Sequence, residues 1–138
     1  MIKLEEDYRP SEGEEYMNDK QLKYFQNKLL KWKAGLLEGT REAMDQLQEA
    51  NLNEPDPMDK ASAELEASSV LRTRDRFRKL IDKIDYALRR IEDKTYGYCE
   101  ETGEPIGLAR LEARPVATLS IGAQEQREKY ECTHSEES

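Results

Sequence analysis

Residues 51–57 read Asn51-Leu52-Asn53-Glu54-Pro55-Asp56-Pro57, and this stretch decides the fold. Its two prolines and two asparagines end a preceding helix and allow the chain to reverse direction. Asp56 can then cap a second helix in which Pro57 takes the first position, where the missing N–H of proline costs nothing. The stretch therefore predicts two antiparallel helices joined by a short loop.

Apolar repeats extend on both sides of this turn with the alternating three- and four-residue spacing of a coiled-coil seam. Before the turn the repeat comprises Leu22, Phe25, Leu29, Trp32, Leu36, Gly39, Ala43, Gln46 and Ala50. After the turn it comprises Ala63, Ala67, Val70, Arg74, Phe77, Ile81, Ile84, Leu88 and Ile91. Helices of roughly 33 to 38 residues would each be about 50 Å long. We expect a coiled-coil hairpin over residues 18–95, with its tip at 52–61.

The two ends of the hairpin sequence differ from its middle. Residues 1–17 form an acidic leader with little apolar periodicity, which we expect to pack at most partly on the rest of the chain. Asn18 and Gln21 have the spacing of a capping box and predict that the first helix starts there. After the hairpin, glycines and prolines interrupt short apolar segments over residues 96–125, which predicts a small globular module. A last helix is expected over 121–131, with a mobile tail to residue 138.

Composition limits the classes of function. Only 36% of the 138 residues are apolar and 38% are charged, and the net charge of −8 argues against binding along a nucleic-acid backbone. No apolar run approaches the ~20 residues that a membrane span needs, and the N-terminus does not resemble a signal peptide. Two cysteines are too few for a disulfide scaffold. We expect a cytoplasmic protein whose main partner is another protein.

Three motifs together resemble the DksA/TraR family of bacterial transcription factors. They are the tip Asp56-x-x-Asp59-x-Ala61, the segment Tyr96-Gly97-Tyr98-Cys99-Glu100, and the segment Arg110-Leu111-Glu112-Ala113-Arg114-Pro115. The resemblance covers about residues 18–130. It implies a mainly α fold, in which a long antiparallel coiled-coil hairpin is joined to a small zinc-finger-like module and a C-terminal helix. It also implies a regulator, not an enzyme, that enters the secondary channel of RNA polymerase and destabilises promoter open complexes.

The resemblance also assigns roles to individual residues. Asp56, Asp59 and Ala61 are expected to approach the polymerase active centre. Arg76, Leu80, Lys83 and Arg114 match positions that bind guanosine tetraphosphate (ppGpp) at the polymerase interface, and cationic side chains suit a polyphosphate. Gln124 stands where nucleotide-responsive members have a lysine, so the strength of the ppGpp response is in question.

The chain departs from the family pattern at the zinc ligands. Four thiolates on two tight turns satisfy tetrahedral zinc, but the four positions here read Cys99, Thr102, Ser120 and Ala123. Hydroxyls are poor zinc ligands at neutral pH and alanine offers none, so we predict no structural zinc. The resemblance is therefore to the cysteine-poor, zinc-independent variants of the family. The one other arrangement in the sequence would use Cys99, Cys132 and His134.

Other interpretations of these residues stay open. Asp56 and Asp59 also suit a plain helix start, because a capping residue and an early acid both stabilise it. The basic residues of the second helix also suit a solvated face with helix ion pairs. The whole chain could be a structural or chaperone-like hairpin that grips client proteins, and an enzyme using the two tip aspartates is a third class. We expect a monomer without sequence-specific contacts to nucleic acid.

Overall fold

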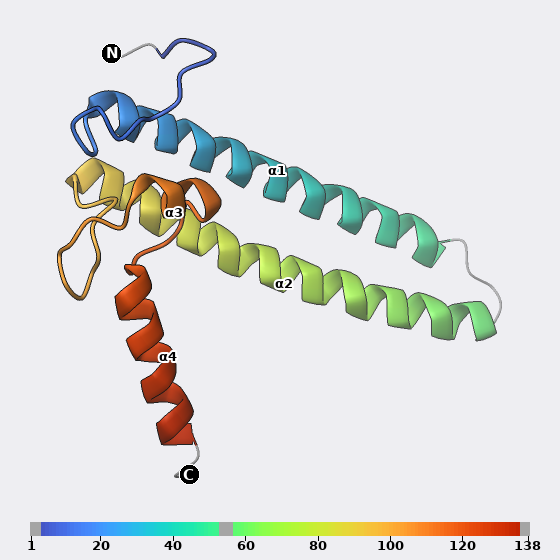
Figure 1. The fold of residues 1–138 in the computed structure, drawn as a ribbon. Coiled ribbons are helices and arrows are strands. Elements are labelled where there is room, and N and C mark those ends of the chain that lie inside the picture. The colour runs from blue at the N-terminus through green and yellow to red at the C-terminus, as the bar shows by residue number, and fades with distance from the viewer. Residues whose placement is uncertain (1–3, 53–56, 136–138) are drawn as a thin grey trace. The chain divides into compact units, whose positions relative to one another are not determined.

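The computed structural model describes residues 4–52 and 57–135, and it describes side chains outside residues 50–59 and 134–138. The helices are α1 (Asp19–Leu52), α2 (Pro57–Asp93), α3 (Leu108–Ala113) and α4 (Ile121–Ser135) (Figure 1). No strand occurs within the described ranges, where Tyr98 and Pro105 form one isolated antiparallel bridge. The expected mainly α fold is confirmed.

The helix starts follow the local sequence signals. The Asn18 side-chain oxygen accepts a hydrogen bond from the Gln21 amide at 2.8 Å, which caps α1 as expected. The Gln21 side chain, however, accepts from the amide of Met17 at 2.8 Å, so it does not complete the reciprocal bond of a capping box. Pro57 begins α2, as the sequence predicts.

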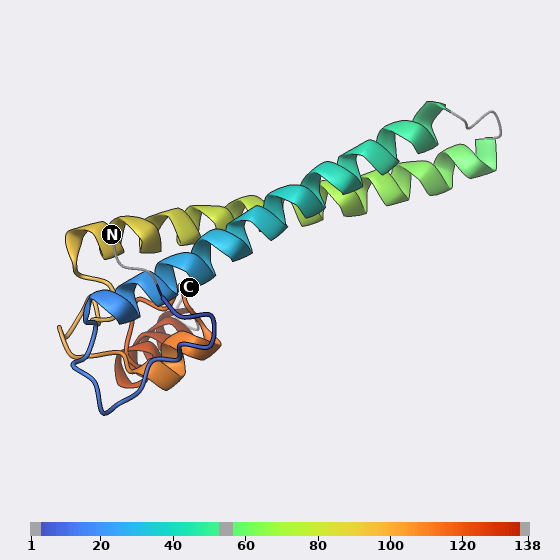
Figure 2. The same ribbon diagram turned by 90° about the horizontal axis from the view of Figure 1, so that it is seen from above.

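The chain divides into two compact units: residues 30–85, here the hairpin unit, and residues 1–29 with 86–138, here the base unit. Within the hairpin unit, parts of α1 and α2 lie side by side and run in opposite directions (Figures 1 and 2). An ion pair of 2.7 Å between Lys33 Nζ and Asp85 Oδ1 joins them and shows which residues lie opposite each other. Further along, a Cβ atom added to Gly39 would lie 3.6 Å from the ring of Phe77. The expected antiparallel hairpin is confirmed.

Burial in the hairpin unit follows the heptad seam. Leu36, Ala63 and Ile84 are buried, and the following seam residues are half-buried: Trp32, Gly39, Ala43, Ala67, Val70, Phe77 and Ile81. Gln46 and Arg74 are exposed, so the seam weakens where its sequence is polar. The apolar side chains that the seam does bury each contribute about 1.5 to 3 kcal/mol when burial is complete.

The base unit has a dense apolar core. Phe25, Leu29, Tyr96 and Leu111 have 1% or less of their surface exposed, and the rings of Phe25 and Tyr96 lie 5.6 Å apart. Two of these residues come from α1, one follows α2 and one lies on α3. The core therefore joins segments from both ends of the sequence.

Two features of the base unit differ from the sequence expectation. The short helix α3 was not predicted, because six residues are too few to establish a helical period. The helix α4 extends to Ser135, past the expected end at residue 131. Residues 136–138 of the expected mobile tail lie outside the described residues.

Candidate functional site

The expected tip site is only partly within the described residues. Asp56 lies outside them, and the side chain of Asp59 is likewise not described. The backbone of Asp59 lies in the first turn of α2, two residues after Pro57, and Ala61 is exposed in the next turn. An acid in the first turn faces the positive end of the helix dipole, which stabilises the helix start whatever else the residue does. The tip assignment stays a prediction.

The expected ppGpp residues divide between the units. Arg76 and Lys83 lie seven residues apart on α2, so they share one side of the helix, and both are exposed. Their Cα atoms are roughly 10 Å apart by helical rise. Leu80 is half-buried between them, and the Arg76 guanidinium stands 5.7 Å from the centre of the Phe77 ring. Two cations at this separation can contact one polyphosphate.

Arg114 belongs to the base unit. It follows α3, where its amide donates to the carbonyl of Arg110 at 2.8 Å, and its side chain is exposed. Gln124 lies on α4 and its side chain donates to Glu128 at 2.9 Å. The assignment of these residues to a nucleotide site stays a prediction.

The four positions of the expected zinc ligands form a hydrogen-bonded cluster in the base unit. Hydrogen bonds to the Cys99 sulfur come from the Thr102 hydroxyl and from the amides of Ser120, Thr102 and Glu101. The Ser120 hydroxyl in turn accepts from the amide of Ala123 at 3.2 Å, at the start of α4. Ala123 is buried, with 4% of its surface exposed.

The donor set of this cluster does not fit zinc. It offers one thiol, two hydroxyls and a methyl group where a tetrahedral site needs four strong ligands. Within residues 4–52 and 57–135 there is no group of three or more His, Cys, Asp or Glu side chains that could hold a metal ion. Cys99 is buried and Cys132 is exposed, while the side chain of His134 is not described, so the alternative cysteine and histidine arrangement gains no support.

Cys99 is more than the small apolar core residue that its isolation in the sequence suggests. Burial raises the pKa of its thiol, but the four hydrogen bonds to sulfur outweigh burial and lower the pKa to about 6. A thiol with this pKa is largely ionised at neutral pH. The cluster therefore stabilises a single thiolate with hydrogen bonds, as a donor-rich pocket does for an anion.

Sequence reasoning missed a second polar contact that holds this part of the chain. The Tyr16 hydroxyl donates to the carbonyl of Gly97 at 2.7 Å and accepts from the amide of Gly107 at 2.9 Å. Met17 is buried beside it, and a Cβ on Gly97 would lie 2.7 Å from Met17 Cγ. We call Tyr16 and Met17 the leader clasp. A single tyrosine at the end of the acidic leader was its only signal in the sequence.

Sequence reasoning also missed the role of Arg90. It is 7% exposed at the end of α2, and its Nη2 donates to the carbonyls of Thr95 at 2.9 Å and Tyr98 at 2.6 Å. Its Nη1 atom is buried without a hydrogen-bond partner among the described residues. The buried guanidinium therefore orders the turn that connects α2 to the module.

Comparisons with known proteins identify the family. The family model for the N-terminal domain of DnaK suppressor protein DksA matches residues 21–91. The model for the prokaryotic dksA/traR C4-type zinc finger matches residues 94–129. The chain belongs to the DksA/TraR family. The zinc-finger model of this family matches even though three of the four thiolate positions carry other residues.

Individual DksA proteins are similar over most of the chain. The RNA polymerase-binding transcription factor DksA of Caulobacter vibrioides (strain NA1000 / CB15N) is 60% identical over 131 residues, which are 95% of this chain and 92% of that protein. The protein of the same name from Escherichia coli (strain K12) is 47% identical over 116 residues, or 84% of this chain and 77% of that protein. The family resemblance expected from the motifs is confirmed.

A solved DksA structure has the same fold. Transcription factor DksA2 from Pseudomonas aeruginosa superposes with a TM-score of 0.78 at 42% sequence identity, covering 84% of this chain and 89% of that chain. Within the described part of this chain, no helix is both long and apolar enough to cross a bilayer.

Proposed function

We propose that this chain is a cytoplasmic, non-enzymatic transcription regulator that binds RNA polymerase as a monomer. Support comes from the relatives, which are named as RNA polymerase-binding transcription factors and align with nearly the whole chain. The hairpin enters the secondary channel of polymerase and brings Asp56, Asp59 and Ala61 near the active centre. There the acidic tip destabilises promoter open complexes, and no sequence-specific contact to DNA is needed.

One observation carries the tip assignment: α2 begins at Pro57, so Asp59 occupies its first turn at the end where the hairpin reverses. The backbone of Asp59 is therefore part of a regular helix, and the residue lies at the start of that helix. It can therefore contact a cation of polymerase, or compete with one that holds the open complex, without help from a metal of its own.

In-vitro transcription from a ribosomal RNA promoter tests the tip. Asp59→Asn removes the charge and keeps the size, so we expect polymerase binding and helicity to persist while inhibition of transcription is lost. Glu64→Gln is the matched control, because Glu64 is an exposed acid one turn further along α2. Equal regulation by wild type and Asp59→Asn contradicts the tip assignment. A structural hairpin that grips client proteins predicts that polymerase does not co-purify with wild-type protein.

The nucleotide response is tested separately. Arg76→Ala and Lys83→Ala should each weaken the effect of ppGpp on transcription, because both cations are expected to contact this polyanion. Regulation in the absence of ppGpp should stay unchanged. Lys79→Ala is the control, since Lys79 is equally exposed and pairs with Asp75 at 3.7 Å. A response that all three variants keep contradicts the ppGpp site while leaving polymerase binding in place.

A further inference from the structure

The helix α3 is too short to maintain its conformation alone. It has six residues, whereas isolated helices shorter than about 12 to 15 residues are marginal in water. Its buried residues Leu108 and Leu111 anchor it in the base unit, but apolar burial is not directional. Arg114, which is expected to contact ppGpp, follows directly after α3. The position of Arg114 therefore depends on the polar contacts around this helix.

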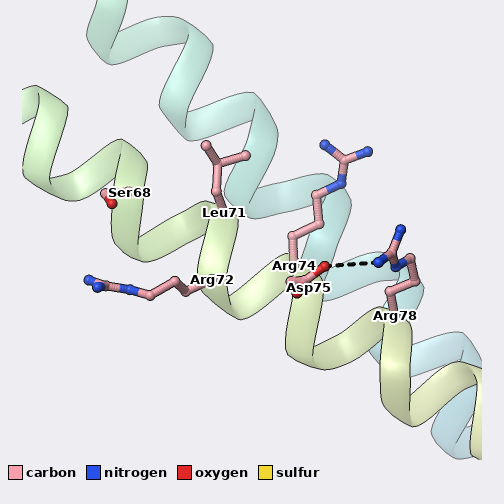
Figure 3. A pocket seen from close by; sticks show the side chains of 6 residues that line it. All are labelled: Ser68, Leu71, Arg72, Arg74, Asp75 and Arg78. Atoms are coloured by element: carbon pink, nitrogen blue, oxygen red, sulfur yellow. Dashed lines mark hydrogen bonds and ion pairs between the residues drawn. The ribbon is translucent and has the colours of Figure 1, made fainter.

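The basic residues of α2 do not need such support. Figure 3 shows three of them around an open hollow of about 530 Å³, which is lined by Ser68, Leu71, Arg72, Arg74, Asp75 and Arg78. They extend from a helix of 37 residues, whose own hydrogen bonds fix the backbone. A cation beside a six-residue helix has to be positioned by other segments of the chain.

Tyr96 fixes the chain directly after Arg114. The Tyr96 hydroxyl donates to the carbonyl of Pro115 at 2.7 Å, and only 1% of the Tyr96 surface is exposed. The backbone of Arg114 is also bonded on both sides. Its amide donates to the carbonyl of Arg110 at 2.8 Å, and its carbonyl accepts from the amide of Ala117 at 3.0 Å. The backbone of Arg114 is thus held in place, while its side chain is exposed.

Lys28 of α1 fixes the chain two residues before Arg114. Lys28 Nζ lies 2.6 Å from the Glu112 carboxylate and donates to the Glu112 carbonyl at 3.0 Å. The Tyr24 hydroxyl donates to the same carboxylate. Glu112 is the acid nearest to Arg114 in the sequence, and its partners on α1 occupy it. Arg114 has no ion-pair partner among the described residues.

A purely structural interpretation is that these bonds only satisfy buried polar groups. It does not explain the Lys28–Glu112 pair, because both side chains are 35% exposed and water could satisfy them. It also does not explain why the contacts from Tyr96 and Lys28 reach residues within two positions of Arg114. A cation with a fixed backbone and an unpaired charge is preorganised for an anion, since binding then costs little conformational entropy.

We propose that Tyr96 and Lys28 are positioning residues for the nucleotide site, which hold the chain around Arg114 so that its guanidinium meets the phosphate groups of ppGpp. The inference rests on the proposed function and deepens it, because it adds residues that act through Arg114 without touching the nucleotide. A guanidinium binds phosphate through two parallel N–H···O bonds, so its contribution depends strongly on its placement.

In-vitro transcription with the full chain and purified polymerase tests the inference. The measured quantity is the ppGpp concentration that gives half of the maximal effect. Tyr96→Phe removes the hydroxyl and keeps the ring, and we expect this concentration to rise about three- to tenfold. Lys28→Met removes a half-exposed ion pair and should shift the concentration in the same direction. Polymerase affinity and regulation without ppGpp should equal those of wild type in both variants.

Two comparisons separate positioning from stability. Leu36→Val removes buried apolar volume from the hairpin unit, so it should lower the thermal midpoint and leave the half-maximal ppGpp concentration unchanged. In a double-mutant cycle, Arg114→Ala should raise that concentration. Tyr96→Phe should then add no further rise, because the residue through which it acts is absent.

Wild-type ppGpp concentrations in both Tyr96→Phe and Lys28→Met overturn the inference. An equal rise in Leu36→Val also overturns it, because loss of stability then explains the effect. A further rise from Tyr96→Phe in the Arg114→Ala chain shows that Tyr96 acts elsewhere, which overturns the inference as well. If Arg114→Ala responds to ppGpp as wild type does, the nucleotide site of the proposed function is refuted together with the inference.

Discussion

The two units are stabilised in different ways. In the base unit, single side chains bond directly to backbone groups: Tyr16 of the leader to Gly97 and Gly107, Arg90 at the end of α2 to Thr95 and Tyr98, and Tyr96 to Pro115 within the module. In the hairpin unit, a heptad seam joins two regular helices, and the ion pairs lie on exposed or half-exposed positions. The stability of the base unit thus depends on individual hydrogen bonds that no neighbouring residue repeats. In the hairpin unit, stability is spread along the heptad seam, and the residues outside the seam are not needed to hold the helices together.

The largest effect is expected from Gly97→Ala in the base unit. The new Cβ would lie 2.7 Å from Met17 Cγ and 2.8 Å from Met17 Sδ, and the φ of +90° is strained for any L-residue. Strain and overpacking together should cost about 2 to 5 kcal/mol of unfolding free energy. Gly103→Ala is the control, since its φ is +76° but nothing lies within 4 Å of the added Cβ. Denaturant unfolding measures both, and equal losses would show that the leader clasp adds nothing.

Tyr16→Phe should have the next largest effect. It removes the two hydrogen bonds of the clasp and leaves the Gly107 amide unpaired, which should cost about 1 to 3 kcal/mol. Tyr8→Phe is the control, because the Tyr8 hydroxyl bonds only within the leader, to Glu14 at 2.8 Å. Hydrogen exchange of the Gly107 amide reads the contact directly. If the Gly107 amide is as well protected from exchange in Tyr16→Phe as in wild type, the clasp is contradicted.

The thiolate cluster makes the base unit depend on pH. The pKa of Cys99 is lowered from 9.0 to about 6 in the folded chain, so the ionised thiol adds stability that is fully present above pH 9 and is lost as pH falls to 6. The stability of wild type relative to Cys99→Ser should therefore increase between pH 6 and pH 9. Thr102→Val removes a donor to sulfur and should diminish this increase. Parallel stability curves for wild type and Cys99→Ser would exclude an ionised thiol.

A smaller and opposite effect is expected in the hairpin unit. Gly39 lies within α1, and a Cβ there would make an ordinary contact of 3.6 Å with Phe77. Gly39→Ala should therefore stabilise the chain by about 0.5 to 1 kcal/mol, because alanine is the better helix former. Gly35→Ala, where nothing lies within 4 Å, separates helix propensity from the added contact. A loss of stability in Gly39→Ala would mean that the seam is as intolerant as the base unit.

The smallest effect is expected from metal removal. Because the four ligand positions hold one thiol, two hydroxyls and a methyl group, treatment with EDTA should leave the thermal midpoint unchanged. A variant with Thr102→Cys, Ser120→Cys and Ala123→Cys restores four thiols and should become sensitive to EDTA after zinc loading. A fall in the wild-type midpoint with EDTA would show that metal stabilises the base unit after all.

The sequence predicts the hairpin unit well and the base unit only in outline. Heptad spacing and Pro57 are local signals, so α1 and α2 could be located without a structure. The Tyr16 contacts join residues 81 and 91 positions apart, and no period or motif reports contacts at such separations. The sequence does not distinguish Arg90 from the other basic residues of α2, because its burial depends on the tertiary fold. The roles of Asp56, Asp59, Ala61 and the ppGpp residues remain predictions, because they concern a partner.

The discontinuous base unit also sets the order in which the chain can fold during synthesis. Residues 1–29 need residues 86–138 to complete their core, and the 56 residues from 30 to 85 emerge from the ribosome between them. At about 5 to 20 residues per second, the first segment waits roughly 3 to 11 s for the start of its partner. During that time Phe25 and Leu29 have no core to enter. Closing the hairpin shortens the gap between the two segments, so hairpin formation should precede and accelerate completion of the base unit.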